Sequence, residues 1–264
     1  METGKEVVKA VIDESKALIK PVYEDLAQPA VKEIGTTLGR SVHALLSPIR
    51  GLCWGFEKIE HVTIQGLEKR LEKVATEKQK TPDPEIAVPL MQALTYTAQN
   101  DTLREMYLNL LANSMNSDYD KAVHPSYVDL IKQMNRLDAL VFQKLTRYSE
   151  KYIPVIRPRI ILREQNKFMI AAMPEYFLGW IVEMFDIFDI STCLVRLSRL
   201  GLIEIDLLSS VLSDEYDKLE SSELLNSIFN AYTKVHANTE YELEAKKGVL
   251  SVNEFGKRFA EACL

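Results

Sequence analysis

The sequence predicts a mainly α-helical protein that ends in a small α+β segment. Through most of the first 150 residues, apolar side chains recur every three to four positions, which is the period of one helical face. Beyond residue 150, short apolar runs bounded by polar residues or glycine predict strands. We therefore expect long N-terminal amphipathic helices over 1–80, a central helical bundle-like core over 81–150, and a small β-hairpin followed by a winged-helix-like α+β subdomain over 151–264.

Composition is that of a soluble globular chain. The 264 residues are 47% hydrophobic and 27% charged. No run of about 18 apolar residues is present, and charges interrupt the apolar positions of the N-terminus, so neither a membrane span nor a signal peptide is predicted. Cys53, Cys193 and Cys263 lie far apart without CxxC spacing, which favours buried thiols over a disulfide or a zinc site. These features predict a cytoplasmic protein without cofactor or metal.

The N-terminal segment has the pattern of amphipathic helices. Residues 5–24 carry one apolar stripe that ends near Pro21, and apolar positions then recur about every 3.6 residues from Ile34 to Val74. Pro48 predicts a kink or break within this second stretch. The charged residues 67–80 favour a solvated helix end.

A face of this segment carries glycines at one-turn spacing beside two aromatic residues. Bare backbone on a helix face allows close packing inside the protein, which we favour. The alternative is a membrane-active or self-associating surface with the aromatic residues at the bilayer interface. Basic residues in the same stretch argue against insertion in the resting protein. The residues of this face are Gly35, Gly39, Gly51, Trp54, Gly55 and Phe56.

The central core begins after a proline-rich stretch. Pro82, Pro84 and Pro89 predict an extended linker ahead of a new helix. A second helix follows over 102–115, with Asp101 as the expected N-cap. A polar loop then leads through His124-Pro125 to a third helix. Asn135 and Asp138 have the spacing of a capping-box variant, which predicts the start of a fourth helix.

The second of these helices carries the motif LREMYLNLLANSM, which is followed by an acidic loop and VHPSYV. This pattern resembles the abortive-infection alpha family of bacterial phage-defence proteins, a domain of unknown function. The resemblance spans most of residues 30–200, to the segment RLSRLGLIEI. It implies a role in defence and assigns no chemistry. The motif residues, which we expect to be structural, are Leu103, Arg104, Asn109, Leu110, Leu111, Ala112, His124 and Pro125.

The last third combines strand and helix patterns. PVIRPRIIL and KFMIAAM flank a polar REQN, which predicts a β-hairpin. Ser191 and Gly201 are the expected caps of a helix that precedes the strand LIEID, and KKGVLSV predicts a returning strand before a final helix. This order resembles the winged-helix pattern. The long insertion between the two strands predicts a further helix over about 221–235.

A winged helix raises the question of DNA binding. Arg196 and Arg199 would face the major groove in such a protein. However, residues 171–264 contain 8 Lys and Arg against 16 Asp and Glu, whereas residues 1–170 contain 24 against 22. Because phosphate neutralisation dominates affinity for nucleic acids, this acidic excess disfavours DNA binding and favours a protein-interaction or a purely structural role.

Catalysis has one sequence candidate, His124, which lies in a polar loop with Asp118 and Asp120. A His-Pro pair before a helix more often caps it, so we favour a structural role. The carboxylates of Asp118, Asp120 and Asp129 do not have EF-hand spacing. Common phosphate-binding, nucleophile-elbow and zinc-protease motifs are also missing from the sequence. We expect no catalytic residue, no metal site and no small-molecule substrate.

Three functions follow in order of preference. The first is a non-enzymatic defence protein that acts through protein–protein contacts or self-association. The second is a membrane effector in which residues 31–60 perturb the bilayer on activation. The third, and least favoured, is a DNA-binding regulator.

Overall fold

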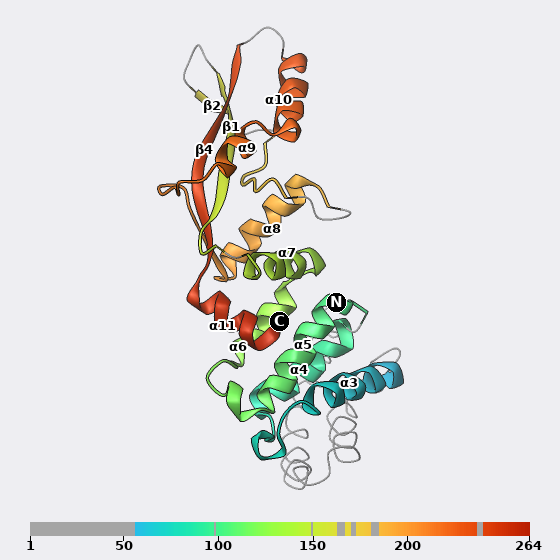
Figure 1. Cartoon of the computed structure of the whole chain (residues 1–264). Helices are drawn as coiled ribbons and strands as arrows, with labels where there is room; N and C mark the ends of the chain where they lie inside the picture. Colours follow the sequence, from blue (N-terminus) through green and yellow to red (C-terminus); the bar gives the residue numbers. More distant parts are fainter. Residues whose placement is uncertain are drawn as a thin grey trace, which may run out of the picture. The chain divides into compact units, whose positions relative to one another are not determined.

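The structure is a computed structural model, which describes residues 56–97, 99–148, 150–162, 167–169, 173–180, 185–236 and 240–264 (Figure 1). The expected helix over 5–24 and the glycine-rich face up to Gly55 lie outside these residues, and of Phe56 only the backbone is described. The chain divides into two compact units. Unit 1 runs to Asn135 and includes Arg258–Leu264, and unit 2 is Arg136–Lys257. The composition-based segments 1–80, 81–150 and 151–264 stay predictions.

Unit 1 is helical and is built around α5 (Asp101–Ser114). This helix packs against α3 (Phe56–Leu71), α4 (Pro84–Thr97) and α6 (Ser126–Gln133). The predicted helical period is confirmed, because its members lie in the core at 4% exposure or less. These residues are Leu103, Met106, Tyr107, Leu110 and Leu111.

The N-cap of α5 is one residue earlier than predicted. The side-chain oxygen of Asn100 accepts a hydrogen bond from the backbone N–H of Leu103, at 3.3 Å. Asp101 instead lies in the first turn, where its carboxylate pairs with Arg104 at 2.8 Å. A carboxylate in the first turn still stabilises the helix dipole, so both residues favour a helix start here.

The segment between α3 and α4 differs from the prediction at both ends. α3 ends at Leu71 rather than continuing through the charged residues, and the amide of Gln79 donates to the carbonyls of Leu71 and Val74 at 3.2 and 2.9 Å. A 3₁₀ turn, η2 (Thr76–Lys78), precedes an isolated bridge from Gln79 to Asn116. The proline linker is shorter than predicted, because only 80–83 precede α4, which begins at Pro84 and includes Pro89.

Proline is compatible with the start of α4 for a geometric reason. The first N–H groups of a helix have no intrahelical acceptor, so Pro84 sacrifices no hydrogen bond. Pro89 lies inside the helix and removes one bond. Burial of the apolar face outweighs that loss, since Ala87, Leu90 and Leu94 are all 0% exposed.

Unit 2 combines helices with a four-stranded sheet in the order β2-β1-β4-β3. The chain order is α7, β1, β2, α8, β3, α9, α10 and β4, followed by α11, whose last residues belong to unit 1. Their bounds are α7 (Arg136–Thr146), β1 (Ile153–Leu162), β2 (Lys167–Met169), α8 (Ile187–Arg199), β3 (Ile203–Asp206), α9 (Glu215–Glu220), α10 (Glu223–Val235), β4 (Tyr241–Val252) and α11 (Glu254–Cys263).

Two strand predictions are confirmed. β1 and β2 form the expected antiparallel hairpin, with Leu162 opposite Lys167. β3 and β4 pair antiparallel, with Ile203 opposite Val252, and Gly201 has a φ of 72° after α8. The sequence did not show that β1 pairs with β4 over ten positions, which joins the hairpin and the returning strand in one sheet. β4 therefore pairs with β1 on one side and with β3 on the other. The winged-helix resemblance stays a prediction.

α8 begins earlier than predicted and is tied to α7 by a buried ion pair. Its N-cap is Asp186, which forms a capping box with Asp189, whereas Ser191 is buried within the helix and accepts from the N–H of Tyr176 at 3.0 Å. Asp138, predicted to cap α7, accepts hydrogen bonds from Arg196 of α8 at 2.7 to 3.1 Å. Ser191 and Asp138, which were both predicted to cap helices, therefore form tertiary contacts instead.

The insertion between β3 and β4 covers one face of the sheet. The predicted helix over about 221–235 is confirmed as α10, and α9 precedes it (Figure 1). Leu219 and Leu225 of these helices share a core cluster with Ile156 and Ile160 of β1. The long insertion is therefore part of the core of unit 2 rather than an exposed wing.

Candidate functional site

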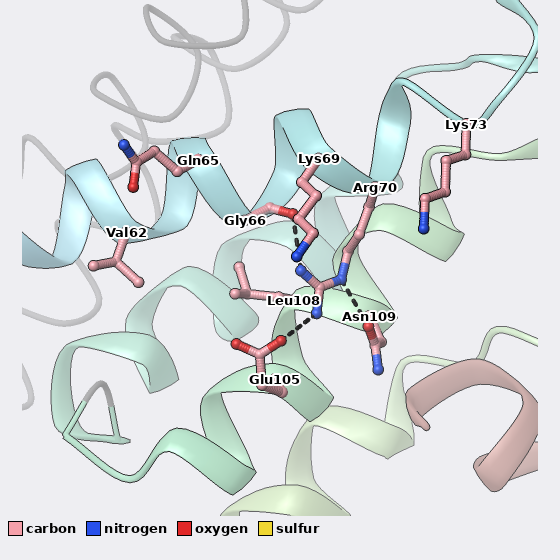
Figure 2. Close-up of a pocket in the computed structure, with 9 residues that line it drawn as sticks. All are labelled: Val62, Gln65, Gly66, Lys69, Arg70, Lys73, Glu105, Leu108 and Asn109. Atoms are coloured by element: carbon pink, nitrogen blue, oxygen red, sulfur yellow. Dashed lines mark hydrogen bonds and ion pairs between the residues drawn. The ribbon is translucent and has the colours of Figure 1, made fainter.

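The family motif lies beside a hollow of about 440 Å³ on unit 1, between α3 and α5 (Figure 2). An amphipathic helix presents polar side chains on the face opposite its buried one, and both helices contribute such side chains here. The lining combines cationic, amide and apolar side chains. The lining residues are Val62, Gln65, Gly66, Lys69, Arg70, Lys73, Glu105, Leu108 and Asn109.

A glycine brings the two helices close together beneath this hollow. A Cβ at Gly66 would lie 2.6 Å from Cδ1 of Leu108, so a side chain at this position would displace Leu108. Val62 and Leu108 supply the apolar part of the lining, and Leu108 is only 1% exposed. The hollow therefore combines an apolar part with a polar rim.

Arg70 is held in one orientation at this rim by three acceptors. Its Nε donates to Oδ1 of Asn109 at 2.7 Å, its Nη1 to the carbonyl of Gly66 at 2.9 Å, and its Nη2 to Glu105 at 2.6 Å (Figure 2). A planar guanidinium bonded on several sides loses little further freedom when it meets an anion. The Arg70 side chain is still 21% exposed, so its charge contributes to the field of the hollow.

Asn109 links the hollow to the end of α11. Its amide donates to the backbone oxygens of Cys263 and Leu264, both at 3.1 Å. Asn113, one turn along α5, donates to the carbonyl of Ala262 at 3.0 Å. The last carbonyls of a helix have no intrahelical donor, and these two amides satisfy them. The motif asparagine therefore positions both Arg70 and α11.

Lys69 and Lys73 complete the basic rim. Both residues are exposed and lie one turn apart, and neither ammonium group has an ion-pair partner among the described residues. Figure 2 shows the Lys69 side chain next to that of Arg70, with Lys73 further along the chain. Three cations against the single carboxylate of Glu105 leave an excess of positive charge. This arrangement suits non-covalent binding of an anionic group beside an apolar one.

The remaining motif residues are used inside unit 1. Leu103, Leu110, Leu111 and Ala112 are buried, and Arg104 pairs with Asp101. Their role as the packed face of α5 follows directly from these positions. Asn109 is the motif residue that also reaches the hollow.

His124 is an exposed residue at the start of α6. Its Nδ1 accepts from the backbone N–H of Ser126 at 3.1 Å and lies 2.8 Å from the hydroxyl of the same residue. These contacts satisfy a donor of the first turn, the structural use that the sequence favoured. Pro125 precedes the helix as its N-cap residue.

The carboxylates near His124 are engaged in ion pairs. Asp118 pairs with Lys78 at 2.8 Å, Asp120 pairs with Lys80, and Asp129 pairs with Lys132 at 3.2 Å. The hydrogen bond that the Lys78 ammonium donates to Asp118 raises the pKa of Lys78. Across the described part of the chain, no group of three or more histidine, cysteine or acidic side chains is arranged to hold a metal ion.

The two arginines considered for DNA differ in their surroundings. Arg196 binds the buried carboxylate of Asp138, and this bond raises the pKa of its guanidinium. Arg199 is exposed. The structure therefore does not present both arginines as a pair of available cations. Among the sequence candidates that the structure describes, Asn109 alone lines the hollow.

Sequence reasoning missed the basic residues of the hollow. Lys69, Arg70 and Lys73 lie in the segment that was predicted to be a solvated helix end. The available signal was Gly66 one turn before Arg70, because a glycine in a helix indicates the close approach of another element. The partner helix itself is not visible in a local pattern.

Fold and site together define a mainly helical protein whose first unit carries a basic hollow suited to binding. The family model for abortive infection alpha matches residues 58–263, so the chain belongs to the abortive infection alpha family and the resemblance is confirmed. The match includes both the hollow and the sheet. Neither the curated proteins nor the solved structures that were compared with the chain gave a match. Among the described residues, no helix has the length and apolar character to cross a membrane.

Proposed function

We propose that this member of the abortive infection alpha family is a non-enzymatic phage-defence protein that binds an acidic segment of a partner protein in the basic hollow. The observation that carries the proposal is the rim itself. Lys69 and Lys73 are exposed and have no ion-pair partner in the described part of the chain, and they flank an Arg70 that is held by three acceptors. Membership of the family supplies the defence role.

The chemistry of the hollow favours a protein segment over a simple anion. The cationic rim attracts carboxylates and speeds their encounter, whereas the apolar part near Val62 and Leu108 binds an apolar side chain. Glu105 opposes a highly charged ligand that lacks such a side chain. A segment that alternates acidic and apolar residues satisfies both parts.

A peptide assay tests the binding directly. The full-length protein is titrated into a fluorescently labelled peptide of alternating Glu and Leu, and anisotropy is followed at increasing salt. We expect Lys69→Glu combined with Lys73→Glu to weaken binding at least about tenfold, because each reversal replaces an attraction with a repulsion. The control is Lys121→Glu combined with Lys132→Glu, which makes the same change in net charge at exposed positions outside the hollow.

The same variants test the defence role in bacteria. The parent protein and the control variant are expected to reduce plaque formation on a sensitive host, whereas the hollow variant is expected to lose protection at an unchanged expression level. Circular dichroism of the purified variants checks that the fold is retained. Full protection by the hollow variant would show that the hollow is not the functional surface.

The membrane effector is retained as the alternative, and the glycine and aromatic spacing of residues 31–60 favours it. Its test is leakage of dye from anionic liposomes after addition of infected-cell lysate. Leakage that persists in the hollow variant would support the membrane role over the proposed one. DNA binding by the predicted winged-helix-like subdomain is not part of the proposal, because Arg196 is already bound to Asp138.

A further inference from the structure

We infer that the hollow takes the loop after β3 of a second copy of this chain, which presents two exposed leucines and the carboxylate of Asp214. The inference rests on the proposed function of the hollow and names its partner. The loop, residues 207–214, carries two leucines that are almost fully in water, with Leu208 92% and Leu212 107% exposed. Such side chains forgo the free energy that burial would provide, so an ordered loop that displays two of them is a candidate contact surface.

The loop is held in this displayed form at both ends. At its start, the carboxylate of Asp206 accepts from the N–H of Leu208 at 2.7 Å and from the hydroxyl of Ser209 at 2.5 Å. At its other end, Tyr216 accepts from the N–H of Val211 at 3.4 Å and donates to the carbonyl of Gly248 at 2.7 Å. These hydrogen bonds therefore fix the backbone at Leu208 and just before Leu212.

A glycine in β4 makes room for this loop. A Cβ at Gly248 would lie 2.7 Å from both the carbonyl oxygen of Asp206 and Cδ2 of Leu207. The backbone of β4 and the beginning of the loop are thus in close contact. This contact adds a third restraint on the path of the chain before Leu208.

One carboxylate at the end of the loop and two on the helices that follow it are opposite in charge to the rim of the hollow. Asp214, Asp217 and Glu223 are exposed, and their carboxylates have no ion-pair partner among the described residues. At the rim of the hollow, Lys69 and Lys73 are likewise exposed and have no ion-pair partner among the described residues. An acidic surface with projecting leucines therefore matches a basic rim with an apolar lining. The volume of about 440 Å³ lies within the usual range of binding pockets.

The partner is a second copy because one chain carries both halves of the match. Residues 171–264 contain 16 acidic against 8 basic residues, and residues 1–170 contain 22 against 24, so the acidic part of one copy attracts the more basic part of another. Hollow and loop are different surfaces, which makes the association head-to-tail and leaves one of each free in a pair of copies. A contact of one loop is smaller than a standard interface, so it forms weakly and reversibly.

Sedimentation velocity of the full-length protein over a wide concentration range tests the inference. The weight-average mass is expected to rise with concentration and to fall with added salt. Two variants are expected to stay monomeric: a hollow variant with Lys69→Glu and Lys73→Glu, and a loop variant with Leu208→Ser and Leu212→Ser. Val235→Ser is the control, because Val235 is 78% exposed on α10 and should associate like the parent.

Mixing the two variants gives the sharpest outcome. The intact loop of the hollow variant fits the intact hollow of the loop variant, so the mixture is expected to form a one-to-one dimer and nothing larger. A parent whose mass does not change with concentration, a loop variant that associates like the parent, or a mixture that stays monomeric would overturn the inference. A loop that docks within its own chain would give the first of these results.

The peptide assay separates this inference from the proposed function. If the parent protein binds the Glu-Leu peptide and the hollow variant does not, the hollow remains a binding site even when no association is found. The partner would then be a different protein. If the parent does not bind the peptide either, the proposed function fails as well.

Discussion

Arg70 in unit 1 and Arg196 in unit 2 are both held by a carboxylate, but the two carboxylates lie in different surroundings. Glu105, the partner of Arg70, has a side chain that is 53% exposed, whereas that of Asp138 is 1% exposed. A hydrated ion pair contributes little to stability, and a buried carboxylate depends on its cation to offset its lost hydration. Arg196 is therefore used to stabilise unit 2, and Arg70 is positioned at a surface.

The difference in exposure between these two carboxylates indicates which cations of this protein are available to a ligand. A cation that neutralises a buried carboxylate is already committed, as Arg196 is in unit 2. In unit 1 the carbonyl of Gly66, the amide of Asn109 and an exposed carboxylate hold Arg70, while Lys69 and Lys73 stay in water. The candidate site therefore lies around an arginine that contributes less to stability than Arg196 does.

The largest expected effect is on the buried pair. We expect Asp138→Asn to lower the free energy of unfolding by about 3 kcal/mol, near the lower end of the range for a broken buried pair because Arg196 is partly exposed. Urea denaturation followed by circular dichroism measures the change. The matched control is Glu105→Gln, for which we expect less than about 0.5 kcal/mol and tighter binding of the Glu-Leu peptide. Equal losses in the two variants would remove the distinction between the units.

A second test compares the close contacts of two glycines. A Cβ at Gly256 would lie 2.1 Å from the backbone oxygen of Leu202 and 2.9 Å from a methyl group of Val252. Backbone cannot move aside as a side chain does, so Gly256→Ala is expected to cost about 2 to 3 kcal/mol of unfolding free energy.

Gly66→Ala is the counterpart in unit 1. Its nearest neighbour is the end of the Leu108 side chain, and alanine also favours a helix more than glycine does. We expect a net change below about 1 kcal/mol. Thermal denaturation of both variants gives the comparison, and a Gly66 variant that is the less stable of the two would contradict it.

The third test concerns the amide that joins the hollow to α11. Asn109 makes three side-chain hydrogen bonds with Arg70, Cys263 and Leu264, whereas Asn113 makes one with Ala262. We expect Asn109→Ala to cost about 2 kcal/mol and Asn113→Ala about 1 kcal/mol in chemical denaturation. Only the Asn109 variant is expected to bind the Glu-Leu peptide several-fold more weakly, because only it releases Arg70. The same affinity in both variants would show that the position of Arg70 does not matter.

The smallest expected effect is a loss of folding stability of unit 2 at alkaline pH. Burial, together with a hydrogen bond to Glu215 at 3.0 Å, raises the pKa of Tyr148 to about 12. Since the folded pKa exceeds the ordinary value of 10.0, the stabilisation is complete below pH 10 and is lost as the pH rises toward 12. A spectrophotometric titration at the tyrosinate band, with Tyr148→Phe as reference, measures this pKa. Ionisation of Tyr148 near pH 10 would contradict the expected shift.

Much of the helical framework was predictable from local patterns. The period of apolar residues located α5, α6, α7 and α10, because a helix that packs on a core must repeat its buried face. Gly201 marked the end of α8, since its positive φ suits glycine. Helix starts were less accurate, because several polar residues near a terminus compete as caps. Asn100 and Asp186 replaced the expected Asp101 and Ser191 for this reason.

The candidate site was not predictable in the same way. Its basic residues Lys69 and Arg70 lie in the last turn of α3, and Lys73 follows the helix. The segment has the composition of an ordinary solvated surface. Likewise, the pairing of β1 with β4 joins residues such as Ile153 and Leu250 that are almost a hundred positions apart. Local periodicity reports that a residue is buried or exposed but does not identify its partner.

Local patterns were therefore enough to predict a mainly helical protein, the burial of α5 and the resemblance to the family. The hydrogen bonds of Asn109 with Arg70, 39 positions away, and with Cys263, 154 positions away, became visible only in the folded chain. The physical reason is that helix formation depends on interactions within a few residues, whereas a hydrogen bond between helices depends on how their faces pack together.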